Sequence, residues 1–295
     1  MIKHDCPRIK LREILGAKCL QSHRTAFQIR SVLGNGKLDN RVMNIDDLLI
    51  LVINLDRSPE RLSSVVAQLD QLGLSWQRLS ASDGKLLSMH DPALIDVPAF
   101  RRKHGKEPLP GELGCYLSHV RAIEAFLLTS KQAVLILEDD VQLGADLPKV
   151  LNNLMASATH WDVVKLSGLH NGTPLFMRAL NGSYRMAVGL SRYTGASCYL
   201  VNRHAAEAYA KDLLPMTLPY DHEYDQAWVR GIRIRMVVPA PCTHSFEMGS
   251  VLHPAGVSRP NFHWTKRLGT LRWRFGNELR RLLHGLWQWC FHRNN

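Results

Sequence analysis

Three consecutive carboxylates stand where a run of apolar residues ends. Residues 133–137 read AVLIL and lead directly into Glu138, Asp139 and Asp140. A short apolar run bounded by polar residues is typical of a buried strand, and ligands of open α/β sheets bind at the carboxyl ends of such strands. Adjacent carboxylates repel one another and must be hydrated, hydrogen-bonded or neutralised, so this cluster is a candidate site for a divalent cation.

Strand geometry indicates how the three acids would be arranged. Side chains alternate along a strand, so Glu138 and Asp140 are expected on one side and Asp139 on the other. An acid-x-acid pair on one face can hold Mg²⁺ or Mn²⁺ together with a diphosphate. A solvated acidic turn after a buried strand is the alternative at this point, because a motif alone is only a hypothesis.

The segments that precede the acids predict a parallel sheet. Residues 48–55 form an apolar, β-branched strand. The sequence SPE at 58–60 combines an N-cap serine, a proline at the first helical position and an acid in the first turn, and Gly73 closes the helix. Residues 74–79 predict a second strand. Because a parallel sheet must be covered on both faces, this β-α-β opening predicts an α/β fold.

The helix expected at 111–132 carries polar residues beside its apolar face. Glu112, Cys115 and His119 fall on one stripe of it. Polar groups next to a core seam are usually hydrogen-bonded parts of the structure. We therefore expect Glu112, Ser118 and His119 to shape the site rather than to perform chemistry.

Further elements follow from the same patterns. Strands are expected at 161–166, at 194–201 and, half-exposed, at 232–236, with a helix at 205–213. Residues 85–110 predict an irregular loop or lid, whose basic run RRKH is either solvated or close to a phosphate.

The basic charge lies at the two ends of the chain. The net charge is +11, with nine Lys/Arg against four acids in 1–46, seven against one in 263–295, and 21 of each in 47–262. We expect a basic N-terminal extension that need not be ordered, a neutral catalytic domain, and a basic tail. A neutral body with basic ends suggests attachment to a negatively charged surface rather than a nucleic-acid groove, so no nucleic-acid partner is expected.

The cysteine pattern and the hydropathy of the chain bear on the cellular compartment in which the protein is expected. The six cysteines form no CxxC pair, which argues against a disulfide framework and a structural zinc site. No stretch approaches the roughly 18 apolar residues of a membrane span, and the first residues lack the pattern of a secretory signal. The expectation is a cytoplasmic protein.

The C-terminal stretch is the most regular in the chain. Apolar residues recur at spacings of three and four, and Lys266, Arg267, Arg274, Arg280 and Arg281 lie off that stripe. This pattern is typical of an interfacial membrane helix, and the alternative is an amphipathic helix docked on its own core. The stripe comprises Trp264, Leu268, Leu271, Phe275, Leu279, Leu282, Leu286 and Trp289.

Three ordered motifs resemble glycosyltransferase family 25, the lipooligosaccharide and lipopolysaccharide galactosyltransferase-like enzymes. They are INLDRSPER at 53–61, GELGCYLSH at 111–119 and LILEDDV at 135–141. The resemblance covers roughly residues 48–250 and leaves both basic ends outside. It implies a GT-A-like nucleotide-diphosphosugar transferase fold with a mostly parallel central sheet, and metal-dependent transfer with inversion. Residues 164–166, 194–196 and 219–221 resemble the later blocks of the family in the same order.

The resemblance also implies roles for individual residues. Glu138 and Asp140 would hold Mn²⁺ or Mg²⁺, with His222 or His244 completing the metal shell. Asp221 would be the catalytic base, with Asp225 and Glu223 as alternates. The residues implied to contact a UDP-sugar donor are Asn54, Arg57, Arg61, Asp83, Glu138 and Asp139.

The function expected from the sequence is transfer of a sugar, with galactose as first choice, from a UDP-sugar to a lipid-linked saccharide in lipopolysaccharide or lipooligosaccharide biosynthesis. The enzyme would work at the inner face of the cytoplasmic membrane, bound to anionic lipid by its C-terminal tail. The alternatives are a Mg²⁺-dependent phosphohydrolase and a non-catalytic protein that binds membrane or nucleic acid through its basic ends.

Overall fold

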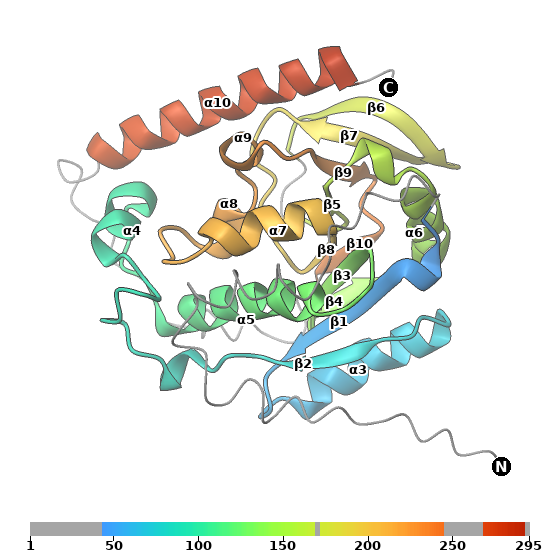
Figure 1. The fold of residues 1–295 in the computed structure, drawn as a ribbon, viewed down its shortest axis with the longest axis horizontal. Coiled ribbons are helices and arrows are strands. Elements are labelled where there is room, and N and C mark those ends of the chain that lie inside the picture. The colour runs from blue at the N-terminus through green and yellow to red at the C-terminus, as the bar shows by residue number, and fades with distance from the viewer. Residues whose placement is uncertain (1–42, 169–171, 245–267, 293–295) are drawn as a thin grey trace. The chain divides into compact units, whose positions relative to one another are not determined.

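The computed structural model describes residues 43–168, 172–244 and 268–292, shown in Figure 1. The predicted basic extension, residues 1–46, falls almost wholly outside the described residues, as do Trp264, Lys266 and Arg267. The domain boundaries expected near residues 46 and 263 stay predictions.

The described chain opens with the predicted β-α-β unit. Strand β1 (Leu48–Asn54) is buried along its whole length, and helix α3 (Pro59–Gln71) begins at the expected proline. Gly73 ends the unit's helix with a φ of +67°, a conformation that favours glycine. Strand β2 (Gln77–Ser80) then pairs with β1 in parallel, with Leu51 opposite Gln77.

An eight-stranded sheet forms the centre, in the order β2-β1-β3-β8-β5-β9-β7-β6. Strand β8 runs antiparallel to both its neighbours, as does β7, and the other six strands point the same way. The predicted α/β class with a mostly parallel central sheet is therefore confirmed. The further strands are β3 (Ala133–Glu138), β5 (Val163–Lys165), β6 (Pro174–Asn181), β7 (Tyr184–Gly189), β8 (Cys198–Asn202) and β9 (Ile234–Val238).

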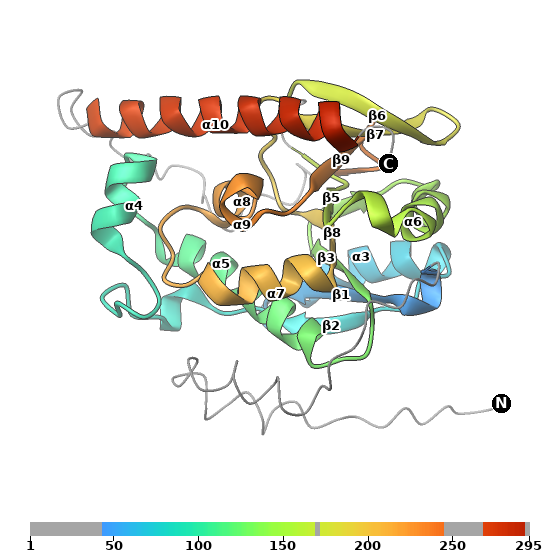
Figure 2. The same cartoon turned by 45° about the horizontal axis from the view of Figure 1, so that its top comes forward.

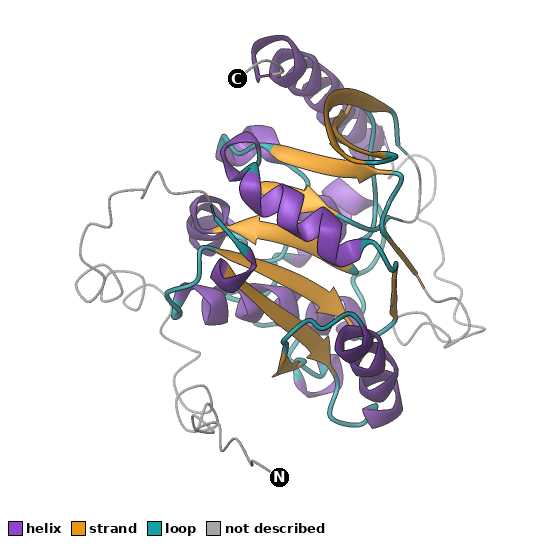
Figure 3. Cartoon of the chain, turned by 90° about the vertical axis from the view of Figure 1, so that its right-hand side faces the viewer, coloured by secondary structure: helices purple, strands orange, loops and turns teal. Residues whose placement is uncertain are grey.

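Both faces of the sheet are covered, because alternate residues of its central strands enter different cores. Leu49 and Leu51 of β1 pack with helices α5 (Pro110–Leu127) and α7 (Arg203–Asp212). Leu48 and Ile50 pack instead with α3 and with α6 (Leu147–Ala156). Figure 3 shows helices on both sides of the sheet. Because β1 pairs in parallel with both β2 and β3, the carboxyl ends of these three strands lie at one edge of the sheet, where the acidic cluster is.

Residues 85–110 differ from the sequence-based expectation. The structure contains a helix there, α4 (Val97–His104), so the prediction of an irregular loop was wrong. The Asp96 carboxylate accepts the backbone N–H of Ala99 at 2.9 Å, and Gly105 ends the helix at a φ of +75°. The helix has only eight residues, too few to give a clear apolar period. Its last turn holds the basic run RRKH.

Two other expectations were wrong in detail. The helix expected to reach residue 132 ends at Leu127, and the strand expected to be half-exposed buries Arg235, which is 1% exposed. Arg235 is covered because Gln288, far along the chain, accepts a hydrogen bond from its Nη2 at 2.8 Å. The shorter elements are η1 (Ile45–Asp47), η2 (Gly84–Leu86), β4 (Val141–Leu143), η3 (Ala158–His160), α8 (Tyr220–Glu223), α9 (Ala227–Arg230) and β10 (Cys242–His244), with β4 and β10 forming a small antiparallel sheet.

The C-terminal helix α10 (Leu268–His292) is present as predicted and lies along the top of Figure 2. Its buried residues are Thr270, Asn277, Arg281, Gly285 and Gln288. The helix therefore contacts the body through its polar face. The large apolar residues exposed on it are Leu268, Leu271, Phe275, Leu279, Leu282, Leu283, Leu286, Trp287 and Phe291.

This arrangement separates the two sequence-based interpretations of the C-terminal stretch. The described helix docks on the protein, but the apolar stripe is not the docked face. Among the described helices, none is both long enough and apolar enough to cross a membrane.

Candidate active site

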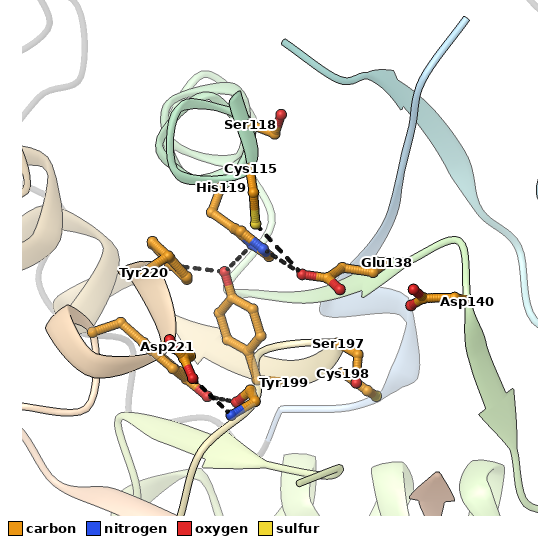
Figure 4. Close-up of polar contacts among 12 residues, drawn as sticks. Cys115, Ser118, His119, Glu138, Asp140, Ser197, Cys198, Tyr199, Tyr220 and Asp221 are labelled. Carbon is orange, nitrogen blue, oxygen red and sulfur yellow. Dashed lines mark hydrogen bonds and ion pairs between the residues drawn. The ribbon is translucent and has the colours of Figure 1, made fainter. Parts of the chain in front are cut away.

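The three carboxylates lie at the carboxyl end of β3, beside the ends of β1 and β2. Glu138 is the last residue of the strand, and Asp139 and Asp140 form the turn into β4. Strand alternation, on which the expected orientation was based, thus stops at Glu138. In Figure 4 the carboxylates of Glu138 and Asp140 nevertheless face the same side.

Glu138 is held by the helix that precedes its strand. His119 Nε2 lies 3.0 Å from Glu138 Oε1, and the Cys115 thiol lies 3.8 Å from the same oxygen. Burial alone would raise the pKa of Glu138, but the hydrogen bond from His119 and the charges of nearby cations outweigh burial and lower the pKa. Glu138 is therefore an ionised carboxylate with a fixed orientation.

Asp140 is a largely buried carboxylate with one oxygen that no described residue binds. Burial and then the charge of Glu138 raise the pKa of Asp140 to about 6, although Arg61 contacts Asp140 Oδ2 at 2.5 Å. Its other oxygen, Oδ1, is buried and has no hydrogen-bond partner among the described residues. His244 Nε2 lies 3.6 Å from Asp140 Oδ2. Two crowded carboxylates with one unpartnered oxygen fit Mg²⁺ or Mn²⁺, which prefer oxygen ligands.

Asp139 is occupied by bonds within the protein. The Asn54 side chain donates to Asp139 Oδ2 at 2.7 Å, and Arg61 Nη2 lies 3.0 Å from Asp139 Oδ1. All three of these residues were predicted to contact the donor, and the structure brings them together. They connect β1, α3 and the acidic turn, so they hold the turn in place.

Arg57 and Asp83 form the exposed rim of this edge. They follow β1 and β2 and make an ion pair with each other, with 43% and 24% of their side chains exposed. The Asp83 carboxylate also accepts the backbone N–H of Lys85 at 3.0 Å, which begins η2. Both remain accessible to a ligand, and their predicted contact with the donor is untested.

Helix α5 places three of the predicted site-shaping residues. Glu112 caps the helix by accepting the Leu109 N–H at 3.0 Å. Ser118 Oγ accepts the Ser82 N–H at 2.8 Å, which fixes the loop that carries Asp83. His119 is fully buried, and its ring stacks on Tyr220 at 4.2 Å. These contacts support the structure around the acids, and no substrate role follows from them.

Sequence reasoning assigned no role to Cys115, although its spacing of four from His119 places both on one helix face. Their ligand atoms and one from Glu138 lie within 4.8 Å of one another and could hold a metal. However, burial, followed by the charges of Glu138, Asp221 and Asp140, raises the pKa of the Cys115 thiol well above its ordinary value. A protonated thiol is a poor ligand, so the oxygen pair fits a cation better.

A second acidic cluster, comprising Asp221, Glu223 and Asp225, lies on and just after helix α8. The charge of Asp221 on α8, after that of Glu138, contributes to the raised pKa of the Cys115 thiol. Asp221 accepts the Gly195 N–H at 3.3 Å, and 26% of its side chain is exposed. Figure 4 shows it on the other side of Tyr199 from Glu138.

The other late acids are tied into ion pairs. Asp225 is 5% exposed and is bound by Lys165 Nζ at 3.1 Å and by Arg281. Glu223 is 8% exposed and lies 3.4 Å from Arg230. His222 is near Asp221 at 3.9 Å, whereas His244 is near Asp140, so of the two histidines suggested as metal ligands His244 is the one beside the acids.

Comparison with known proteins identifies the family. The sequence model of glycosyltransferase family 25, described as an LPS biosynthesis protein, matches residues 48–224, which is more than half of the chain. The chain belongs to glycosyltransferase family 25. Its mixed α/β fold, with a mostly parallel central sheet and acids at the end of β3, agrees with the architecture that the family resemblance implied.

Relatives of this family 25 member are distant and much longer. A glycosyltransferase 25 family member of Anopheles gambiae is 28% identical over 203 residues, 63% of this chain and 34% of the relative. Human procollagen galactosyltransferase 2 is 27% identical over 123 residues, 39% of this chain and 20% of the relative. The chain thus spans about a third or less of these relatives. Human and cattle relatives named inactive family members also match.

Among solved structures, a glycosyltransferase involved in glycosylation of the major capsid of PBCV-1 matches with a TM-score of 0.38 and 14% identity. That match covers 69% of this chain and 95% of the solved chain.

Proposed function

We propose that this family 25 member transfers a sugar from a UDP-sugar to an acceptor hydroxyl with inversion at the anomeric carbon. The observation that carries the proposal is the buried Asp140 oxygen, which has no hydrogen-bond partner among the described residues and lies in the turn that directly follows Glu138. Galactose is the first candidate for the sugar, because one matching relative is named a galactosyltransferase.

The donor's diphosphate would lie at the carboxyl end of β3. Glu138, Asp140 and His244 are the residues that would hold Mn²⁺ or Mg²⁺. When bound, such a cation offsets negative charge on the diphosphate and so stabilises the departing nucleotide. Arg57, exposed at the rim, would contact the same diphosphate, since guanidinium groups recognise phosphate oxygens.

Asp221 would act as the general base. Direct displacement requires a carboxylate that removes the proton of the acceptor hydroxyl as the oxygen attacks the anomeric carbon. Asp221 is the most exposed of the three late acids, and the Gly195 N–H holds one of its oxygens. The proton moves to Asp221, and the bond to the diphosphate breaks on the opposite face of the sugar.

A UDP-sugar panel tests this proposal. We expect purified protein to release UDP from one sugar donor with Mn²⁺ and little without it. Asp140→Asn should raise the activation free energy by several kcal/mol and so lower turnover about 10³-fold. Circular dichroism should show that the variant is still folded. Undiminished turnover of Asp140→Asn, or release of phosphate from a monoester without sugar transfer, would contradict the proposal; the second outcome would favour a phosphohydrolase.

We further propose that the acceptor is a lipid-linked saccharide, of the lipopolysaccharide or lipooligosaccharide type, reached at an anionic membrane surface. The outward face of α10 supports this. The single acid of the helix, Glu278, turns inward to Arg192 at 2.7 Å, whereas Arg272 and Arg280 are exposed beside the apolar stripe. An apolar face flanked by positive charge suits anionic lipid. A second copy of the helix would instead bring like charges together.

Vesicle binding tests the membrane surface. Deleting residues 263–295 would also break the ion pair between Arg281 and Asp225 and could destabilise the body. Point substitutions on the outward face of α10 avoid this side effect. We expect the double variant Leu279→Glu, Leu282→Glu to bind phosphatidylglycerol vesicles far more weakly than wild type and to keep its turnover of a soluble acceptor. Val229→Glu, which changes an exposed apolar residue on α9, is the matched control. Equal vesicle binding by the double variant would remove the proposal.

A further inference from the structure

A small cavity lies between the inward face of α10 and strands β5, β7 and β9. Its space for the centres of water molecules is about 40 Å³. Since one water needs roughly 10–15 Å³ of such space, the cavity holds a few waters or one small polyatomic ion. The polar residues that line it include Lys165, Asp225, Trp228, Arg235, Arg281 and His284.

The charges on the cavity wall do not balance. Lys165, Arg235 and Arg281 face one carboxylate, Asp225, which Lys165 and Arg281 already share. Glu278 lies 3.4 Å from Arg281 Nε, but its carboxylate is bound by Arg192.

Arg235 is the extreme case. It is 1% exposed, and its hydrogen bonds go to neutral oxygens, the Ile234 carbonyl at 3.2 Å and the Gln288 side chain at 2.8 Å. Within the described ranges no carboxylate forms an ion pair with Arg235. A buried charge that forms no ion pair is costly. Burial, followed by the charge of Arg233, lowers the pKa of Arg235 to about 10, and the charge of Asp162, which is paired with Arg233, opposes this shift.

The same wall presents buried nitrogens that make no hydrogen bond within the described chain, although Arg281 Nε lies 3.4 Å from Glu278 Oε2 in an ion pair. Nε of Arg235, Nε of Arg281 and Nε1 of Trp228 are buried donors with no hydrogen-bond partner in the described part of the chain, and His284 Nε2 is also unpartnered. Arg235 and Arg281 are both more than nine-tenths buried. Water could satisfy these donors, but it would not neutralise the charge.

We propose that this cavity binds a phosphate-type oxyanion, either inorganic phosphate or the phosphate of a lipid headgroup. A phosphate presents several acceptor oxygens and a full negative charge, which matches two guanidinium groups, an ammonium and an indole N–H. The residues come from β5, β9, α9 and α10, so the bound anion would link the sheet to the C-terminal helix. This site is separate from the proposed donor site at the end of β3.

Thermal unfolding and calorimetry with inorganic phosphate test the first source. We expect phosphate to raise the Tm of the full chain above its value in chloride at equal ionic strength, because a ligand of the folded state stabilises it. Arg235→Met removes the charge and keeps most of the side-chain volume, and it should abolish this response. Arg185→Met, which changes an exposed arginine of β7 outside the cavity wall, is the matched control and should respond as wild type does.

A gentler variant covers the case in which Arg235→Met fails to fold. Trp228→Phe deletes one N–H donor and no charge, and we expect it to weaken phosphate binding about tenfold, the usual worth of a hydrogen bond to a charged group. For the second source, phosphatidylcholine vesicles with and without phosphatidic acid replace free phosphate. The site is supported if either ligand raises the Tm of the wild-type protein and this rise is lost or reduced in the Trp228 or Arg235 variant. No protection by either ligand, or equal protection of all variants, overturns it.

Discussion

The two acidic clusters of this chain look alike in sequence, and the fold treats their members differently. At the end of β3, Asp139 is taken up by hydrogen bonds, whereas Asp140 keeps a buried oxygen without a partner in the described structure. Around α8, Glu223 and Asp225 are held in ion pairs, whereas Asp221 stays partly exposed. In each cluster some acids are bound within the fold, and at least one carboxylate keeps an oxygen or an exposed surface that the described fold does not use. A cluster of acids in the sequence therefore indicates the region of a candidate site but does not identify which carboxylate would react.

The sharpest test of this contrast is Asp221→Asn. Loss of a general base should lower turnover about 10²- to 10⁴-fold and leave the donor KM nearly unchanged. Steady-state kinetics with the preferred UDP-sugar measures it. Glu207→Gln, an exposed acid on α7, is the control and should behave as wild type. If Asp221→Asn retained full turnover, the assignment of Asp221, rather than Glu223 or Asp225, as the general base would be wrong.

Asp225→Asn should act on stability instead. It leaves Lys165 and Arg281 buried without their shared carboxylate, which costs about 3–5 kcal/mol of unfolding free energy. Urea denaturation measures this loss. Adding Arg281→Met should recover part of it, because the two side chains contact each other and their effects are not additive. Strictly additive losses would show that the pair is not coupled.

The pH dependence of Asp140 probes the first cluster. Its pKa is raised from 3.8 to about 6, so the folded protein binds more protons than the unfolded chain between these values. The contribution of Asp140 to the free energy of unfolding therefore falls by up to ~3 kcal/mol as the pH rises from about 4 to about 6. Without metal, wild type should gain stability from pH 7 to pH 5 relative to Asp140→Asn. With Mn²⁺, affinity should fall as the pH drops below about 6, because the ligand must be deprotonated. Parallel pH profiles of the two proteins would contradict the raised pKa.

The smallest expected effect is that of His119→Gln. His119 bonds to Glu138 and orients it without reaching the substrate region itself. Loss of such support typically lowers metal affinity about 10–100-fold, which titration of turnover against Mn²⁺ would show. His90→Gln, an exposed histidine, serves as control. A fall in turnover at saturating Mn²⁺ with unchanged metal affinity would instead point to direct chemistry by His119.

The sequence predicted the frame of the site well because that frame rests on local patterns. The apolar run before Glu138 and the helix start at Pro59 were sufficient to place the acids at the end of a central strand. Helix α4 was missed because its eight residues show too little apolar period, and its cap at Asp96 is a single contact. The burial of Arg235 was missed because Gln288, which covers it, lies 53 residues away.

What the sequence by itself determined was the opening β-α-β unit, the position of the acidic cluster after a buried central strand, and the two-sided character of the C-terminal helix. Only the tertiary structure decided which carboxyls stay available and which face of α10 meets the body. The reason is distance along the chain. Arg61 reaches Asp140 across 79 residues and Arg281 reaches Asp225 across 56, and no local period encodes such pairings.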